Sequence, residues 1–413
     1  MLREMGRRAK EASLTLMNLD AATKSAGLVA IANALTAHTD EILAENKKDV
    51  DAFLEKGGSA AMADRLRLTK ERIAAMAEGV LKVNALPEVV GEVLGMTKRP
   101  NGLVIGKKRV PLGVIGMIYE ARPNVTVDAA VLCLKTSNAC ILRGGSEAIF
   151  SNSILTDIMT KALHSAGFPD GSLQLVRDTS RETVVNLMRL NEYLDVLIPR
   201  GGKGLIQSVV QNATVPVIET GTGNCHIYIE KTADMDMAVR ILYNAKTSRP
   251  SVCNAAESLL VDRLIAKEVL PQIALSMAEK QVELRGCDKT REILPEIKTA
   301  TEEDFYTEYN DYILSIKVVE DIHEAIAHIN THGTGHSEAI ITSDYTSANL
   351  FLDSIDAAAV YVNASTRFTD GDEFGFGAEI GISTQKLHAR GPMGLEALTS
   401  TKYIVYGNGQ VRE

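Results

Sequence analysis

The sequence has no run of eighteen apolar residues and no excess of positive charge. A transmembrane helix needs about twenty consecutive apolar residues, so we predict none. Lys and Arg number 44 against 53 Asp and Glu, which gives a formal net charge of −9. Binding to a phosphate backbone calls for a basic face, so this balance argues against a nucleic-acid partner. With 45% apolar and 23% charged residues, the composition is that of a soluble globular protein.

Cysteine is scarce, and none of the five cysteines lies in a Cys-x-x-Cys pair. Their odd number and scattered positions exclude a disulfide framework and the usual zinc spacings, and they suit a reducing cytosol. Cys133 and Cys140 lie inside apolar segments, where packing is the expected role. Cys225 follows a glycine-rich turn and is also expected to pack, with a position near a functional site as the alternative, whereas Cys287 lies in a polar stretch. Cys253 is the remaining thiol.

A secretory signal is not expected, because residues 1–18 are basic and lack its apolar core. We expect an amphipathic first helix there and a cytoplasmic protein. The chain, at 413 residues, is too long for one ordinary domain, so two or more are predicted. Helical spacing of apolar residues continues to Gly57, and Thr69 is expected to cap another helix. Residues 96–117 then alternate and carry Asn101-Gly102, which predicts a projecting β-hairpin.

Apolar strands alternating with helices follow the hairpin. Examples are "GVIGMIY", "ACILRG", "LQLVRD", "DVLIPRGG" and "VPVIETG", and this alternation predicts a doubly wound parallel sheet. Glycine-rich turns at 144–145 and 201–202 follow strand ends, where a nucleotide would bind, although neither is a complete dinucleotide motif. The alternative is that these glycines only shape tight turns. A second α/β unit is predicted from Cys225 to about Val362.

Cys253 lies in "TSRPSVCNAAES", followed at once by the apolar run "SLLVD", which we interpret as a helix beginning near the thiol. The positive end of a helix dipole favours a thiolate, the nucleophilic form of cysteine. From these residues alone, a buried structural cysteine is the simpler interpretation and a nucleophile is the alternative.

Six segments together resemble the aldehyde dehydrogenase superfamily over nearly the whole chain. In order they are "PLGVIGMIYEARPN", "LRGGSE", "IPRGGKG", "IETGTGN", "TSRPSVCNAAE" and "EFGFGAEIGIS". The stretch "VEDIHEAIAHINTHGTGHSEAII" is similar to a signature of the branch that reduces glutamyl phosphate. The resemblance implies a Rossmann-type cofactor domain (1–95 and 118–224, with 363–396 returning to it) and a catalytic domain (225–362). It also implies an oligomerisation arm (96–117 and 397–413) and an active site between the two domains.

The resemblance implies NADPH-dependent reduction of L-glutamyl 5-phosphate to L-glutamate 5-semialdehyde, a step of proline biosynthesis, with Cys253 as nucleophile. Reducing an acyl phosphate in this way needs a thioester, and cysteine is suited to form it. The alternatives are an oxidative dehydrogenase that acts on a free aldehyde and a catalytically silent protein of the same fold. A homo-oligomer, dimer or tetramer, is implied as well, together with functional coupling to glutamate 5-kinase.

Asn124 falls on the position of the side-chain oxyanion donor of the superfamily, and it could also cap a helix. The superfamily usually has Pro-Trp-Asn there, but this chain has Arg122-Pro123-Asn124 and no tryptophan at all, which suggests a polar pocket. Glu219 matches the general base of the oxidative enzymes. An acyl-phosphate reductase needs this base less, so we expect Glu219 to line the nicotinamide pocket.

The resemblance also assigns ligand-binding residues. Arg143 is expected to pair with the 2′-phosphate of NADPH, with a solvated strand-end charge as the alternative. The other residues expected to bind cofactor are Gly201, Gly202, Gly204 and Glu308. Substrate candidates are Glu120 for the ammonium group and Arg122, Arg249 and Arg367 for the carboxylate and phosphate. His323, His328, His332 and His336 are spaced like a possible metal cluster, but the superfamily needs no metal, so none is predicted.

Overall fold

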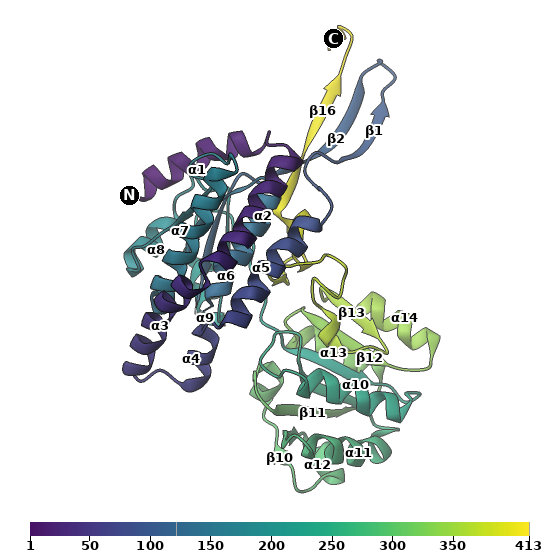
Figure 1. Ribbon diagram of the computed structural model, residues 1–413. Coiled ribbons are helices and arrows are strands. Elements are labelled where there is room, and N and C mark those ends of the chain that lie inside the picture. The colour runs from purple at the N-terminus through teal and green to yellow at the C-terminus, as the bar shows by residue number, and fades with distance from the viewer. Residues whose placement is uncertain (121, 413) are drawn as a thin grey trace. The chain divides into compact units, whose positions relative to one another are not determined.

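The computed structural model describes residues 1–120 and 122–412, without the side chains of residues 60 and 61. The chain divides into two compact units (Figure 1). Unit 1 comprises Met1–Thr220, Gly375–Gly381 and Met393–Glu413, and unit 2 comprises Gly221–Phe374 and Ile382–Pro392. The predicted boundary, between residues 224 and 225, lies four residues further along the chain. The returning segment differs from the prediction, because residues 363–374 and 382–392 belong to unit 2.

Unit 1 is built on a four-stranded parallel sheet in the order β5-β4-β3-β6. All six residues of β3 are buried, as expected of a strand that is covered on both faces. The strands are β3 (Val114–Tyr119), β4 (Ala139–Arg143), β5 (Leu173–Leu175) and β6 (Val196–Arg200). The predicted strand "VPVIETG" is reduced to one bridge between Leu197 and Val217.

The helices of unit 1 surround this sheet, and α6 contacts α2, α5 and α7. Thr69 caps α5 as predicted, since its hydroxyl accepts from the backbone N–H of Arg72. The helices are α1 (Leu2–Leu16), α2 (Ala21–Ala37), α3 (Thr39–Glu55), α4 (Ala60–Leu66), α5 (Lys70–Ala85), α6 (Pro123–Lys135), α7 (Ile149–Ser165), α8 (Arg181–Met188) and α9 (Lys203–Asn212), with short 3-10 turns at Ser146–Ala148 and Leu395–Leu398.

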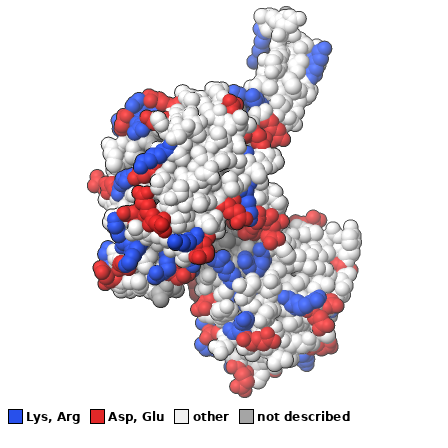
Figure 2. All heavy atoms as spheres, in the orientation of Figure 1, with Lys and Arg blue, Asp and Glu red and all other residues white. Residues whose placement is uncertain are grey.

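An arm of three antiparallel strands extends from unit 1, with β2 (Val104–Pro111) between β1 (Val93–Lys98) and β16 (Thr399–Tyr406) (Figure 1). The predicted hairpin is present over residues 93–111, whereas the end of the predicted range, 96–117, belongs to β3 of the central sheet. The two-residue turn typical of Asn-Gly needs a positive φ at both positions, but here only Gly102 takes one, of 89°. Basic side chains lie on both sides of the arm in Figure 2.

Unit 2 contains a seven-stranded sheet in the order β10-β9-β11-β8-β7-β12-β13, with parallel pairing throughout. Its strands are β7 (Cys225–Ile229), β8 (Ala256–Asp262), β9 (Glu283–Gly286), β10 (Lys298–Thr299), β11 (Ile313–Val319), β12 (Ser337–Ile341) and β13 (Ala359–Val362). A separate antiparallel pair joins β14 (Ile382–Ser383) to β15 (Gly391–Pro392).

The helices of unit 2 are α10 (Met235–Thr247), α11 (Ala266–Ala278), α12 (Asp288–Ile293), α13 (Ile322–His332) and α14 (Tyr345–Ser354), with 3-10 turns at Glu302–Tyr306 and Thr366–Phe368. Aliphatic side chains of α10 and α11 pack with those of β7, β8 and β11 in one apolar cluster. Among the described residues of both units, no helix has the length and apolarity that crossing a membrane requires.

Candidate active site

Cys253 lies in a turn, not at the start of a helix. The turn connects Thr247, the last residue of α10, to Ala256, the first residue of β8. The predicted helix after Cys253 is wrong, because "SLLVD" forms the fully buried strand β8 between β7 and β11. Cys253 is therefore not at the N-terminus of a helix. Cys253 is half-buried, and its carbonyl accepts a hydrogen bond from the Cys225 thiol at 3.2 Å.

Arg367 and Asn254 hold this turn in place. The guanidinium of Arg367 donates to the Asn254 side-chain oxygen and, at 3.1 Å, to the Ser248 hydroxyl. The side-chain amide of buried Asn254 donates to the backbone carbonyl of Thr369 at 2.9 Å. The backbone carbonyl of Asn254 accepts from the Thr366 hydroxyl at 2.7 Å. The turn is thus fastened at both ends to the segment that carries Arg367.

The guanidinium of Arg367 gives Cys253 a cationic neighbour. Burial lowers the pKa of Arg367, and the neighbouring charge of Arg249 lowers it further, while an anionic Cys253 would raise it. Arg367 therefore lies within electrostatic reach of the thiol, and Arg249 lies within electrostatic reach of Arg367. A nearby cation favours a thiolate, so Arg367 can supply the effect that was expected from a helix dipole.

Gly223 lies directly against the nucleophile turn. Its backbone N–H donates to the Glu308 carboxylate at 2.8 Å. A Cβ atom at this position would lie 1.4 Å from the Cys253 carbonyl oxygen, so only glycine fits. Glu308, predicted to bind cofactor, is therefore hydrogen-bonded to Gly223, the residue that packs against the backbone of Cys253.

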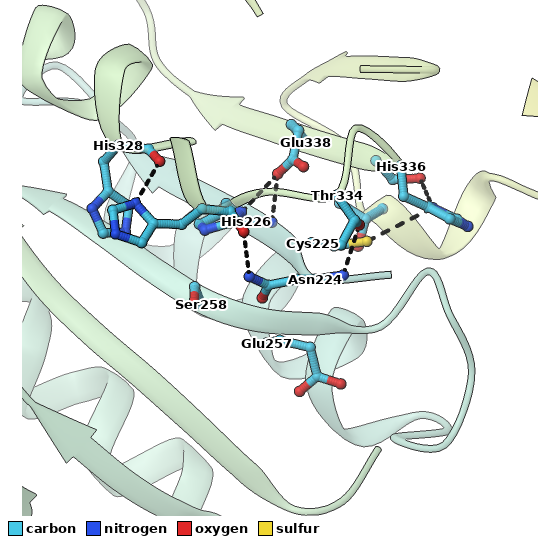
Figure 3. A network of polar contacts seen from close by, with 12 residues as sticks. Asn224, Cys225, His226, Glu257, Ser258, His328, Thr334, His336 and Glu338 are labelled. Carbon is cyan, nitrogen blue, oxygen red and sulfur yellow. Dashed lines mark hydrogen bonds and ion pairs between the residues drawn. The ribbon is translucent and has the colours of Figure 1, made fainter. Parts of the chain in front are cut away.

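A buried polar network continues from this point (Figure 3). The Asn224 amide donates to the carbonyls of Phe305 and His332, at 2.7 and 2.9 Å. The backbone N–H of His226 donates to Glu338 at 2.6 Å, and its ring Nδ1 lies 3.1 Å from the same carboxylate. These bonds anchor β7 on either side of Cys225, whose thiol contacts the Cys253 carbonyl. Within the described residues, no group of three or more His, Cys, Asp or Glu side chains is arranged to hold a metal.

In unit 1, Asn124 lies on the first turn of α6. Arg122 is the N-cap residue and Pro123 begins the helix, so the suggestion that Asn124 itself caps the helix is wrong. Asn124 is exposed, and its amide donates to the Asp128 carboxylate one turn later, at 3.0 Å. One amide hydrogen remains for another acceptor, as an oxyanion donor requires.

Glu120 contacts the predicted cofactor turn. Its carboxylate accepts from the backbone N–H of Gly202, the N-cap residue of α9, at 3.0 Å. A Cβ atom on Gly201 would lie 2.5 Å from the same carboxylate, whereas one on Gly204 would meet open space. Glu120 thus occupies the helix N-terminus, a position that suits an anion.

Arg143 ends β4 and is half-buried. One guanidinium nitrogen donates to the Thr179 carbonyl at 2.7 Å, and burial lowers the pKa of the group. Its buried Nε has no hydrogen-bond partner among the described residues, which fits a binding group prepared for a ligand anion. Glu219, half-buried, follows the bridge at Val217.

The structure therefore brings Cys253, Arg249, Arg367 and Glu308 together in unit 2. It places the other predicted site residues in unit 1. Four residues beside Cys253 were not predicted from the sequence: Gly223, Lys246, Asn254 and Glu257. Glu257 offered a signal, since a carboxylate inside an apolar strand calls for a buried partner.

Comparisons with known proteins agree with this architecture. The model of the aldehyde dehydrogenase family matches residues 2–305 and 295–404. A gamma-glutamyl phosphate reductase of Clostridium perfringens is 63% identical, with 98% of each chain covered.

Two solved structures extend the comparison. The crystal structure of gamma-glutamyl phosphate reductase from Thermotoga maritima aligns over 100% of both chains with a TM-score of 0.98 and 50% identity. An acetylating aldehyde dehydrogenase of Geobacillus thermoglucosidasius has the same fold, with a TM-score of 0.71, 17% identity, and 100% of this chain and 97% of its own covered. This chain belongs to the aldehyde dehydrogenase family and, within it, to the gamma-glutamyl phosphate reductases.

Proposed function

We propose that the protein reduces L-glutamyl 5-phosphate to L-glutamate 5-semialdehyde and phosphate, with NADPH as reductant and Cys253 as nucleophile. The observation that carries the proposal is the Cys253 turn itself. A half-buried thiol lies in a turn held by Arg367 and Asn254, within electrostatic reach of the Arg367 guanidinium, which itself neighbours Arg249. This arrangement favours the thiolate and places cations where an anionic substrate would bind.

The Cys253 thiolate attacks the acyl carbon of the substrate, and the bond from that carbon to the phosphate oxygen breaks. Phosphate leaves with the electron pair, and a glutamyl thioester remains on Cys253. NADPH, when bound, supplies the hydride that brings this thioester to the aldehyde oxidation state. The carbon–sulfur bond then breaks, which releases the semialdehyde and regenerates the thiolate. The side-chain amide of Asn124 and the backbone N–H of Cys253 would stabilise the oxyanion that develops on the acyl oxygen.

The cofactor domain fits a nicotinamide dinucleotide, the cofactor class of the family. Arg143 offers a buried Nε donor at the end of β4, which suits the 2′-phosphate of NADPH. The turn of Gly201, Gly202 and Gly204 would receive the pyrophosphate once Glu120 releases the N–H of Gly202. Glu120 is therefore a better candidate for this turn than for the substrate ammonium. Glu219 would line the nicotinamide pocket and Glu308 would contact the nicotinamide ribose.

For the substrate anions, Arg249 and Arg122 are the better candidates. Arg367 already donates hydrogen bonds to Ser248 and Asn254, so its main role would be to hold the turn. Arg249 is exposed and neighbours Arg367, as a group that meets a phosphate or carboxylate should be.

The arm offers a surface for a second copy of the chain. Its outer strands, β1 and β16, each pair with β2 on one side only, and exposed strand edges seek partners. We propose a homo-oligomer formed through this arm. The cytoplasmic location and the coupling to glutamate 5-kinase remain predictions.

The reverse reaction tests the proposed function. A thioester that is resolved by phosphate and not by water makes NADP⁺ reduction with glutamate semialdehyde depend on inorganic phosphate. We expect the rate to fall to background in a phosphate-free buffer and to return when phosphate is added. Equal rates with and without phosphate would instead identify an oxidative aldehyde dehydrogenase.

A further inference from the structure

Two oppositely charged residues are fully buried beside the nucleophile turn. Lys246 and Glu257 are both 0% exposed, and their charged groups lie 2.5 Å apart. Lys246 lies in the last turn of α10 and Glu257 is the second residue of β8. The eight residues between these elements, 248–255, form the turn that carries Cys253. The ion pair therefore joins the two elements between which the turn is suspended.

Stability alone is a poor explanation for this pair. Burial raises the pKa of Glu257 and lowers that of Lys246, and the attraction between them opposes both changes. Removing two charges from water carries a large desolvation cost, and replacing a buried ion pair with apolar residues of similar volume is often neutral or stabilising. A buried ion pair does, however, fix the geometry of the elements that it joins more strictly than apolar contacts do.

The second oxygen of Glu257 connects the pair to the Glu308 loop. It accepts the backbone N–H of Asn310 at 3.2 Å, and Asn310 is held at φ 56°, a conformation that few residues adopt. The ammonium of Lys246 also lies 6.0 Å from the ring of Tyr309. The pair thus contacts the two residues that follow Glu308.

Glu308 completes a closed path back to the nucleophile. Its carboxylate accepts the N–H of Gly223, and Gly223 packs against the carbonyl of Cys253. From Cys253 the path runs through the turn to α10 and β8, through the ion pair to the Glu308 loop, and through Gly223 back to Cys253. Each step is a hydrogen bond, an ion pair, a packing contact or a short stretch of chain, and all of it lies within unit 2.

We propose that Lys246 and Glu257 are a positioning pair that fixes the Cys253 turn relative to the Glu308 loop. The inference rests on the proposed function in assigning chemistry to Cys253. The pair touches neither substrate nor reacting atoms. It acts by keeping the thiol beside Arg367 and by holding the loop that would contact the cofactor.

Double substitutions test the pair without leaving a lone buried charge. Lys246→Met with Glu257→Met removes both charges and the acceptor for Asn310, and the long unbranched side chain of methionine fills the space. Lys246→Met with Glu257→Gln removes the charges but keeps that acceptor. Tyr228→Phe is the matched control, because it deletes a buried hydrogen bond of 3.3 Å to Asp262 at the far end of β8.

Three quantities are measured for each variant: the melting temperature, kcat in the phosphate-dependent assay, and the rate of Cys253 alkylation by iodoacetamide across pH. The dimethionine variant should melt near the wild type, yet its kcat should fall by up to about 10²-fold because the nucleophile is misplaced. In this variant, Cys253 should react with iodoacetamide roughly tenfold more slowly at pH 7. The pH midpoint of that reaction should lie about one unit higher, because the thiolate moves away from the Arg367 guanidinium. The variant with Glu257→Gln should have a kcat and a Cys253 alkylation rate between those of the dimethionine variant and the wild type. In Tyr228→Phe, Cys253 should be alkylated at the wild-type rate.

Wild-type alkylation and kcat in the dimethionine variant would overturn the inference. So would the loss of folding in both double variants, which would make the pair a stability element. Alkylation needs no substrate or cofactor, so the comparison of alkylation rates tests the positioning pair even if the wild-type enzyme shows no activity in the phosphate assay. That failure would count against the proposed function alone.

Discussion

Gly223 and Cys253 are in backbone contact although thirty positions separate them in the sequence, and a Cβ on Gly223 would lie 1.4 Å from the Cys253 carbonyl oxygen. A real Cβ never approaches an oxygen so closely, so any larger residue must displace the turn. The position of the nucleophile therefore depends on a glycine that has no chemistry of its own.

Gly223→Ala should displace Cys253 and lower kcat by at least about 10²-fold, since a misplacement of about 1 Å has that effect. Gly79→Ala is the control, because a Cβ there meets nothing within 4 Å, and alanine stabilises a helix by up to about 1 kcal/mol. Steady-state rates and melting curves of both variants check this. A fully active Gly223→Ala enzyme would show that the contact does not constrain the turn.

Arg143→Ala should weaken NADPH binding more than NADH binding. A lost charge-assisted hydrogen bond to the 2′-phosphate is worth roughly 1.5–3 kcal/mol. Fluorescence titration with both cofactors measures the difference, and Arg177→Ala, which removes an exposed arginine of the same unit paired with Asp157, should bind both normally. Equal losses for NADPH and NADH would mean that Arg143 does not contact the 2′-phosphate.

Asn124→Ala should reduce kcat on the order of 10²–10³-fold, because one oxyanion donor is removed while the backbone donor at Cys253 remains. KM for the semialdehyde should change little, since the interaction forms in the transition state. Asn212→Ala removes another exposed amide of unit 1, one that donates to the Ser208 carbonyl, and should leave kcat unchanged. A larger effect on KM than on kcat would assign Asn124 to substrate binding instead.

His328 should make unit 2 sensitive to mild acid. Burial, and then the neighbouring His226, His332 and Lys317, lower the pKa of this ring from 6.5 to about 2. Below about pH 6.5 the unfolded chain binds a proton here that the folded protein does not, so stability falls as the pH falls. One such group lowers the free energy of unfolding by about 2 kcal/mol when the pH falls from 7 to 5.

Urea unfolding at the two pH values measures this effect. The wild type should lose about 2 kcal/mol more than His328→Gln, which cannot titrate. The exposed His164 serves as a control, and His164→Gln should lose as much as the wild type. Equal losses for the wild type and His328→Gln would exclude His328 as the acid-sensitive group.

Much of the fold follows from the local pattern. The apolar strands and the helices between them were predictable because a doubly wound sheet repeats one simple alternation. The hairpin followed from Asn101-Gly102, although only Gly102 takes the positive φ. The run "SLLVD" was misassigned because a short apolar run fits a buried strand and a helix segment equally well. Its pairing with β7 and β11, distant in sequence, decides the outcome.

The site was only partly predictable for the same reason. The resemblance identified Cys253, but the groups that hold its turn come from distant segments. Arg367 was expected to bind substrate, and the structure shows it bonded to Asn254 and Ser248. Glu120 was expected to bind the ammonium group of the substrate, but its carboxylate accepts a hydrogen bond from the backbone N–H of Gly202. Residue type suggested a binding role for each, but the partner is set by tertiary contacts that no local pattern contains.

The most direct test of the account is the reactivity of Cys253. Cys253→Ala should show no phosphate-dependent reduction of NADP⁺ while still folding and binding NADPH. Cys253→Ser should be almost inactive, because a hydroxyl is barely ionised and its ester accepts hydride poorly. In the wild type, peptide mapping after brief iodoacetamide treatment should find Cys253 labelled first and protected by the acyl phosphate. An active Cys253→Ala enzyme, or labelling that favours another cysteine and ignores substrate, would contradict the thioester mechanism.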